Sequence, residues 1–190
     1  MAKRASNTSS LTGGTGDVNP QFLSGKITLS AANTATELTL GTPIVRVGPQ
    51  SNGQAIIMEI LKIFCDMPPI DVDAAAATAR QRVISFSTVS SGGTPAVTTL
   101  DNPRNLITIA QDLRNAFTAA GTGILALGND PMVADLTDGA GHGVLVATDN
   151  LFIAASTSGQ AGASTFSFKI LYRFKKVSLV EYIGIVQSQQ

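Results

Sequence analysis

Cysteine, histidine and tryptophan are almost absent from this chain of 190 residues, which has one cysteine, one histidine and no tryptophan. A single cysteine excludes an intramolecular disulfide and a zinc cluster built on cysteines. Cys65 ends the apolar run 56–65, so it is expected to be a buried structural thiol rather than a nucleophile.

The single histidine offers little basis for catalysis. His142 lies in the glycine-rich segment 138–143, which is typical of a turn with positive φ. A Ser-His-Asp triad would have to use this histidine with Asp135 or Asp138, and the chain contains no Gly-x-Ser-x-Gly nucleophile elbow. We therefore expect no enzyme and no cofactor, and an enzyme built on His142 is the weakest of the functions considered.

Charge is also scarce, because only 14% of the residues are charged and 13 basic side chains balance 13 acidic ones. Few ionic groups and a net charge near zero favour association, as expected for a subunit that buries its sides against copies of itself. A weakly charged monomeric domain is the alternative. No segment approaches the roughly eighteen apolar residues of a membrane span, and no signal peptide is evident. We expect a protein made in soluble form in a reducing compartment, without a membrane partner.

What the chain does have is a hydrophobic fraction of 44% and many short alternating segments, which suit a single domain with a sizeable core. Breakers such as Gly48-Pro49 and Pro68-Pro69 separate them. Six to eight strands joined by turns predict an antiparallel β sandwich or barrel. The predicted strands are 22–30, 37–40, 44–47, 54–66, 80–89, 144–147, 151–154 and 165–175.

The last predicted strand, Thr165 to Lys175, alternates most regularly. Its apolar face carries four of the chain's aromatic residues, which predicts a core strand.

One segment departs from this pattern. Between Asn102 and Gly121, apolar residues recur at helical spacing behind an apparent Asn102 cap with Pro103 in the first turn. The spacing predicts one inserted helix near 103–119, lying across an open end of the sandwich.

Two sets of charged residues are candidate binding sites. Asp71, Asp73, Asp135 and Asp138 have the loop spacing of an intersubunit calcium site, although solvated turn aspartates fit the same spacing and the EF-hand pattern is missing. The candidate nucleic-acid contacts are Lys3, Arg4, Lys26, Lys169, Arg173 and Lys175. They form no dominant basic stripe, and a solvated or intersubunit face is an equal alternative for the strand residues.

The C-terminal run from Leu171 to Gln190, LYRFKKVSLVEYIGIVQSQQ, closely resembles the ending of capsid proteins from CRESS-DNA viruses, whose circular single-stranded genomes encode a replication initiator. The segment 135–150, DLTDGAGHGVLVATDN, is similar to their penultimate strand region. The resemblance implies an all-β fold, a single jelly-roll sandwich of two four-stranded antiparallel sheets in Greek-key order. It also implies a virion protein that forms an icosahedral homo-oligomer of roughly sixty copies around single-stranded DNA. Many members carry a long arginine-rich arm, whereas this chain has only Lys3 and Arg4 near its start.

The chain is thus divided into a flexible arm at 1–20, a jelly-roll domain at 21–177 and a C-terminal assembly segment at 178–190. Tyr182, Ile183, Ile185 and Val186 are the expected anchors of that segment, against a neighbouring subunit or under its own sandwich. An ordinary last strand is the alternative for the segment. For the whole protein, the alternative is a β-sandwich binding module of lectin or adhesin type.

Overall fold

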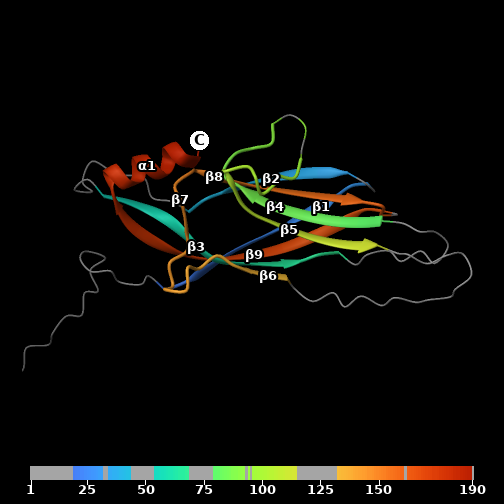
Figure 1. The fold of residues 1–190 in the computed structure, drawn as a ribbon, viewed down its shortest axis with the longest axis horizontal. Coiled ribbons are helices and arrows are strands. Elements are labelled where there is room, and N and C mark those ends of the chain that lie inside the picture. Colours follow the sequence, from blue (N-terminus) through green and yellow to red (C-terminus); the bar gives the residue numbers. More distant parts are fainter. Residues whose placement is uncertain are drawn as a thin grey trace, which may run out of the picture.

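The computed structural model describes residues 19–31, 34–43, 54–68, 79–92, 94, 96–114, 132–160 and 162–189. Two antiparallel sheets pack face to face (Figure 1). The first sheet contains β1 (Gln21–Leu29), β3 (Gln54–Asp66), β6 (Met132–Asp135), β7 (Val144–Val146) and β9 (Ser164–Ser178). The second contains β2 (Ala35–Gly41), β4 (Ala79–Ser87), β5 (Asn105–Arg114) and β8 (Asn150–Ser158).

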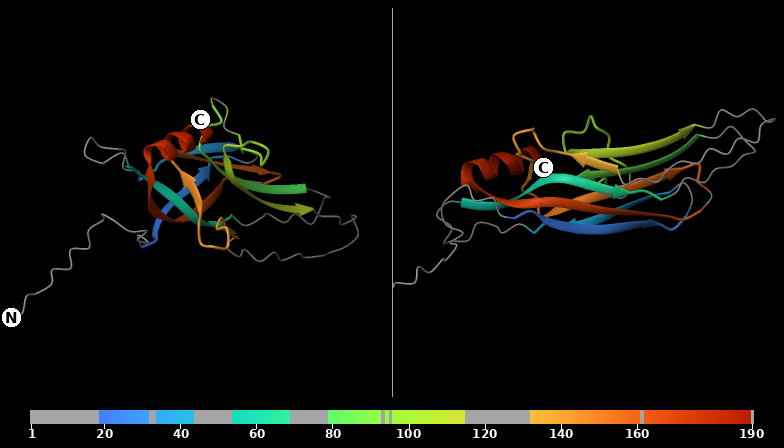
Figure 2. Two further views of the ribbon diagram at one scale, coloured as in Figure 1. Left: turned by 60° about the vertical axis from the view of Figure 1, so that its left-hand side comes forward. Right: turned by 90° about the horizontal axis from the view of Figure 1, so that it is seen from below.

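The strand order is that of a jelly roll. It runs β1-β9-β3-β6 in the first sheet, with β7 also paired to β3, and β2-β8-β4-β5 in the second. Successive strands therefore cross repeatedly from one layer to the other, and the right-hand view of Figure 2 separates β4 and β5 from β1 and β9. The predicted all-β jelly-roll sandwich is confirmed, with five strands rather than four in the first sheet.

The core lies between the two sheets and follows the predicted alternation of β9. Phe166, Phe168, Ile170 and Tyr172 are buried on one face of this strand. The ring of Phe168 meets Phe86 of β4 edge-on, with centroids 5.5 Å apart, so an aromatic pair joins the two layers. Gly25 on β1 makes room for the Phe168 ring, because a Cβ there would lie 2.5 Å from its Cζ atom.

The predicted helix near 103–119 is wrong over its described part. Residues 105–114 form strand β5, which pairs with β4 along its whole length. The side chain of Asn102 accepts a hydrogen bond from the amide of Arg104 at 3.0 Å, so it stabilises a turn rather than a helix start. The β-branched run Ile107 to Ile109 favours the extended backbone. Residues 115–119 lie outside the described part.

One helix is present among the described residues, at the other end of the chain. Helix α1 (Leu179–Gln189) follows directly on β9, so the alternative of a final strand at this position is wrong. Ser178 accepts a hydrogen bond from the amide of Glu181 at 3.2 Å and caps the helix. In the described part of the chain, no helix is long and apolar enough to cross a membrane.

The predicted strand at 44–47 and residues 1–18 of the predicted arm lie outside the described residues.

Candidate functional site

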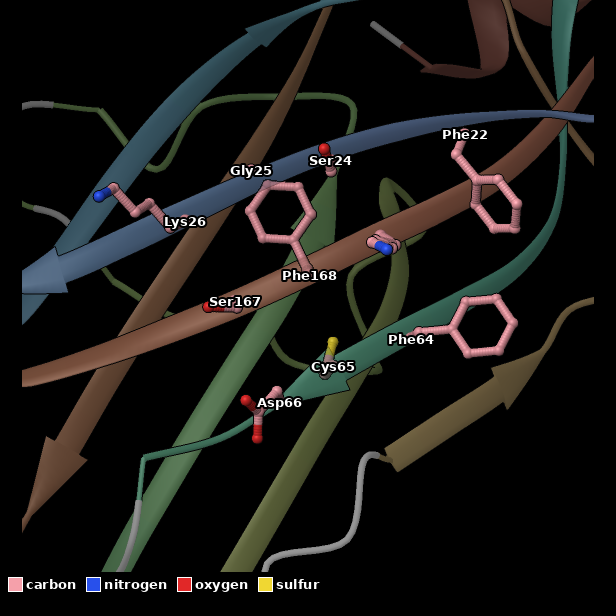
Figure 3. A pocket seen from close by; sticks show the side chains of 10 residues that line it. Phe22, Ser24, Gly25, Lys26, Phe64, Cys65, Asp66, Ser167 and Phe168 are labelled. Atoms are coloured by element: carbon pink, nitrogen blue, oxygen red, sulfur yellow. The ribbon is translucent and has the colours of Figure 1, made fainter.

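An open groove of about 710 Å³ lies on the outer face of the first sheet, over β1, β9 and β3 (Figure 3). Strand register brings its residues together from three distant parts of the sequence. Ser24 lies opposite Lys169, which lies opposite Phe64, and Lys26 lies opposite Ser167, which lies opposite Asp66. We call this the β1–β9–β3 groove. Its lining residues are Phe22, Ser24, Gly25, Lys26, Phe64, Cys65, Asp66, Ser167, Phe168 and Lys169.

Two aromatic rings lie at one end of the groove. The ring of Phe22 is 61% exposed and its centroid lies 6.3 Å from that of Phe64, with the ring planes tilted by 54°. Figure 3 shows these two rings together and Lys26 toward the opposite end. Exposing a phenylalanine to water forfeits its burial energy, so this end of the groove is suited to a flat apolar ligand or partner.

The structure separates the predicted nucleic-acid contacts into three groups. Lys26 and Lys169 come together in the groove as exposed residues. Arg173 and Lys175 instead face Glu59 further along the same sheet. Lys3 and Arg4 lie outside the described residues.

Glu59 is a buried carboxylate that the sequence did not reveal as a site. Its side chain is 0% exposed and accepts a hydrogen bond from Arg173 Nε at 2.5 Å. The Gly143 amide donates to its other oxygen at 2.9 Å, and Lys175 Nζ lies 3.7 Å from that oxygen. Arg173 also donates to the Gly141 carbonyl at 2.9 Å, so Glu59 and Arg173 together fasten the segment before β7 to the sheet.

Burial alone would raise the pKa of Glu59, because the charged form loses its hydration. The hydrogen bonds from Arg173 and Gly143 and the charges of Lys175 and Arg173 outweigh this effect and lower the pKa below its ordinary value. The carboxylate of Glu59 is therefore ionised at neutral pH. It pairs with Arg173 and Lys175, two of the residues predicted to contact nucleic acid, and so forms a buried ion pair within the first sheet.

The acidic residues Asp135 and Asp138, in and after β6, are each bound by a neighbouring side chain. Asp135 forms an ion pair with Lys62 at 2.8 Å, and Asp138 accepts from the ring Nδ1 of His142 at 2.9 Å. The hydrogen bond from Lys62 lowers the pKa of Asp135 to about 2, and the one from His142 lowers that of Asp138 to about 2. Between Asp138 and His142, Gly139 and Gly141 both adopt positive φ, as the predicted turn requires.

The four aspartates proposed for calcium are not brought together in the described structure. Asp71 and Asp73 lie outside the described residues, while Asp135 and Asp138 are bonded to different partners. Among the residues that can be described, no three His, Cys, Asp or Glu side chains gather in a way that could hold a metal ion. Cys65 is 1% exposed, and burial raises its pKa to about 12, which agrees with a structural thiol.

Helix α1 covers the end of the first sheet beside β3, β7 and β9 (Figure 1). Of the four predicted anchors, Tyr182, Ile185 and Val186 pack against a small cluster formed by Ala55, Ile57, Ala147 and Val177 of the same chain. The fourth, Ile183, is 46% exposed, and its neighbour Val180 is 83% exposed. The helix thus has one face on its own sheet and a second apolar face, with Val180 and Ile183, that remains largely exposed in the described structure.

Gln189 fixes the far end of α1, which sequence reasoning missed. Its side chain accepts from the Ala147 amide at 3.0 Å and donates to the Leu145 carbonyl at 2.5 Å. Its own carbonyl accepts from the hydroxyl of Thr88 at 3.1 Å, next to β4 of the second sheet. The start of the helix had a readable signal, because Ser178 followed by Glu181 matches the capping-box pattern Ser-x-x-Glu.

No protein-family model matches the chain, and no curated protein sequence matches it either. Among solved structures, the chain is similar to VP1 of trichodysplasia spinulosa-associated polyomavirus, determined in complex with 3'-sialyllactose. The two share 9% identity, with 86% of this chain and 98% of that chain covered and a TM-score of 0.51. The VP1 pentamer of human polyomavirus 6 also matches, at 9% identity, coverage of 83% and 95%, and a TM-score of 0.49.

At this level of identity the likeness bears on the fold alone. It agrees with the strand order described above, because the matched region extends over nearly the whole of a jelly-roll viral capsid protein. The chain therefore has the jelly-roll fold seen in viral capsid proteins.

Proposed function

We propose that this protein is the structural subunit of a small viral capsid, of the CRESS-DNA type that its C-terminal run resembles. The observation that carries the proposal is the complete two-sheet jelly-roll order, β1-β9-β3-β6 against β2-β8-β4-β5, in a chain with so little charge. On this proposal the protein is made in soluble form in the host cell and ends in the virion. Roughly sixty copies related by closed symmetry would enclose single-stranded DNA.

Exposed apolar side chains support self-association. The described residues include six large hydrophobic side chains that remain well exposed, on strands, a loop and α1: Phe22, Leu100, Val133, Leu179, Val180 and Ile183. In a chain with 14% charged residues, such side chains leave much of the surface suited to contact with copies of itself.

Within the predicted assembly segment 178–190, helix α1 is the element proposed to contact a neighbouring subunit. Tyr182, Ile185 and Val186 hold the helix on its own sheet, and Gln189 anchors its end. Val180 and Ile183 are the side chains left for a neighbouring subunit. The helix is therefore presented as a preformed unit, which reduces the entropy lost on assembly.

The test is the mass of the particles formed by purified full-length protein, measured by multi-angle light scattering after size exclusion. The double variant Val180→Ser, Ile183→Ser should elute as small folded species, whereas wild-type protein forms large particles. Leu100→Ser tests whether the effect is specific to the helix, because Leu100 is 76% exposed but lies between β4 and β5 rather than on α1.

Particles of wild-type mass from the double variant would rule out α1 as the assembly element. A wild-type protein that stays monodisperse and monomeric in every assembly condition would count against the capsid function itself. Glycan-array binding by such a monomer would instead favour a lectin-like or adhesin-like binding module.

A further inference from the structure

We propose that the β1–β9–β3 groove binds a short stretch of single-stranded nucleic acid, with bases stacked on Phe22 and Phe64 and phosphates held by Lys26 and Lys169. The inference rests on the proposed capsid function and names the surface of the subunit that meets the genome. It is carried by the juxtaposition, across three strands, of the exposed ring of Phe22, the half-buried ring of Phe64 and two lysines that form no ion pair with a described residue.

Stacking is the first part of the argument. Proteins that bind single strands without sequence preference combine aromatic platforms with a positive groove. Phe22 and Phe64 provide two ring faces with centroids 6.3 Å apart, tilted by 54° and open to solvent at Phe22. The chain has only eight phenylalanines, and two of them lie side by side on an outer sheet face rather than in the core.

Charge is the second part. Among the described residues, Lys26 and Lys169 form no ion pair, in contrast to Lys62, Arg173 and Lys175, which face Asp135 or Glu59. The groove also contains one carboxylate, Asp66, which interacts electrostatically with the buried guanidinium of Arg82. Two lysines against one aspartate leave the groove positive.

Geometry is the third part. Residues 22 to 26 of β1 cover four strand steps, about 13 Å, from the aromatic end of the groove to Lys26. The hydroxyls of Ser24 and Ser167 lie in the same rows as the lysines and can donate to phosphate or base oxygens. Stacking, hydroxyl and cationic groups are therefore arranged within the length of a few nucleotides.

A second copy of this chain is the competing occupant. The cores of protein interfaces are depleted of lysine, whereas Lys169 lies at the centre of this groove, between Ser24 and Phe64. Phosphate complements these lysines, and a base complements the rings beside them. The nucleic-acid assignment is therefore favoured over a contact between subunits.

The experiment measures binding of fluorescein-labelled oligothymidylate to the full-length protein by fluorescence anisotropy over a range of salt concentrations. Oligouridylate of equal length forms a second arm that separates DNA from RNA. Phe22→Ala should weaken binding by about 5- to 150-fold, the effect of losing one stacked base. The double variant Lys26→Gln, Lys169→Gln should lower the slope of log affinity against log salt by about 1.4.

Two controls match these changes. Val133→Ala removes an exposed apolar side chain from the same sheet, and Lys176→Gln removes an exposed charge from the same strand as Lys169. Both should bind as wild type. Urea unfolding of each variant checks that the fold is intact.

Unchanged affinity in Phe22→Ala and an unchanged salt slope in the lysine variant would overturn the inference. So would a Phe22→Ala variant that loses subunit association while binding oligonucleotide normally, because that result identifies an interface between copies. Particle formation is read separately. Wild-type particles with no groove-dependent binding refute this inference alone, whereas groove-dependent binding without particles refutes the capsid function alone.

Discussion

The buried ion pair between Glu59 and Arg173 allows a quantitative test of how the first sheet is stabilised. Replacing Arg173 by methionine keeps the length and apolar stem of the side chain but leaves Glu59 with only the Gly143 amide and Lys175. Removing one partner of a buried ion pair costs about 3–5 kcal/mol. Because Arg173 keeps 18% exposure and two other groups still face the carboxylate, we expect the lower end, about 3 kcal/mol.

The assay is urea unfolding followed by circular dichroism at neutral pH and at pH values below the ordinary pKa of a glutamate. The pKa of Glu59 is lowered in the folded protein, so its stabilising contribution is complete above the unfolded pKa and is lost as pH falls through the folded one. The stability gap between wild type and Arg173→Met should therefore narrow in acid. A thermal scan at neutral pH should show a midpoint lower by about 6–12 °C.

Two further variants make the prediction specific. The double variant Glu59→Gln, Arg173→Met should lose less than the single one, because it leaves no uncompensated charge in a buried position. Lys62→Met breaks the ion pair with Asp135. Because the Lys62 side chain is 40% exposed and that of Asp135 is 50% exposed, this variant should leave the unfolding midpoint unchanged within error. An Arg173→Met variant as stable as Lys62→Met, or a stability gap that does not change with pH, would refute the reasoning.

Three more predictions concern packing. Gly143→Ala should lower the free energy of unfolding in urea by about 1–3 kcal/mol, because the new Cβ would lie 2.0 Å from the Ile60 carbonyl oxygen. An unchanged free energy would contradict this and show that the segment before β7 can shift freely. Ile57→Ala should lower the free energy of unfolding by about 2–5 kcal/mol, because this side chain is buried under the helix. It should also speed amide hydrogen exchange throughout α1, and unchanged exchange would contradict that packing. Cys65 should react with a disulfide reagent at neutral pH only after unfolding, given a pKa of about 12, so rapid reaction of the native protein would contradict its burial.

Much of the sandwich could be predicted from alternation alone. The expected strand at 54–66 coincides with β3, and the aromatic face from Phe166 to Tyr172 is buried as expected. These strands lie in the middle of a sheet, where burial of one or both faces imposes the pattern most strongly.

Strand β5 was missed because its sequence satisfies two periods. Leu106, Ile109 and Ala110 fit a helix, but pairing with β4 and the β-branched residues between 107 and 109 decide in favour of a strand. Asn102 was wrongly predicted to cap a helix for a related reason, because an asparagine side chain can either cap a helix or close a turn.

Helix α1 shows the opposite failure. The segment 178–190 was predicted as an assembly segment, with an ordinary last strand as the alternative and no helix expected, yet the cap at Ser178 and the packing of Tyr182 and Ile185 on the sheet stabilise a helix. The groove was beyond sequence reasoning altogether. Phe22, Phe64 and Lys169 become neighbours only through the order β1-β9-β3, which local patterns do not encode.

Negative-stain electron microscopy of purified full-length protein is the most direct test of the capsid function. Images should show closed spherical particles of uniform diameter, with an absorbance ratio that reports nucleic acid in those that survive nuclease treatment. Images containing only isolated subunits, under conditions where circular dichroism shows the β fold intact, would contradict it.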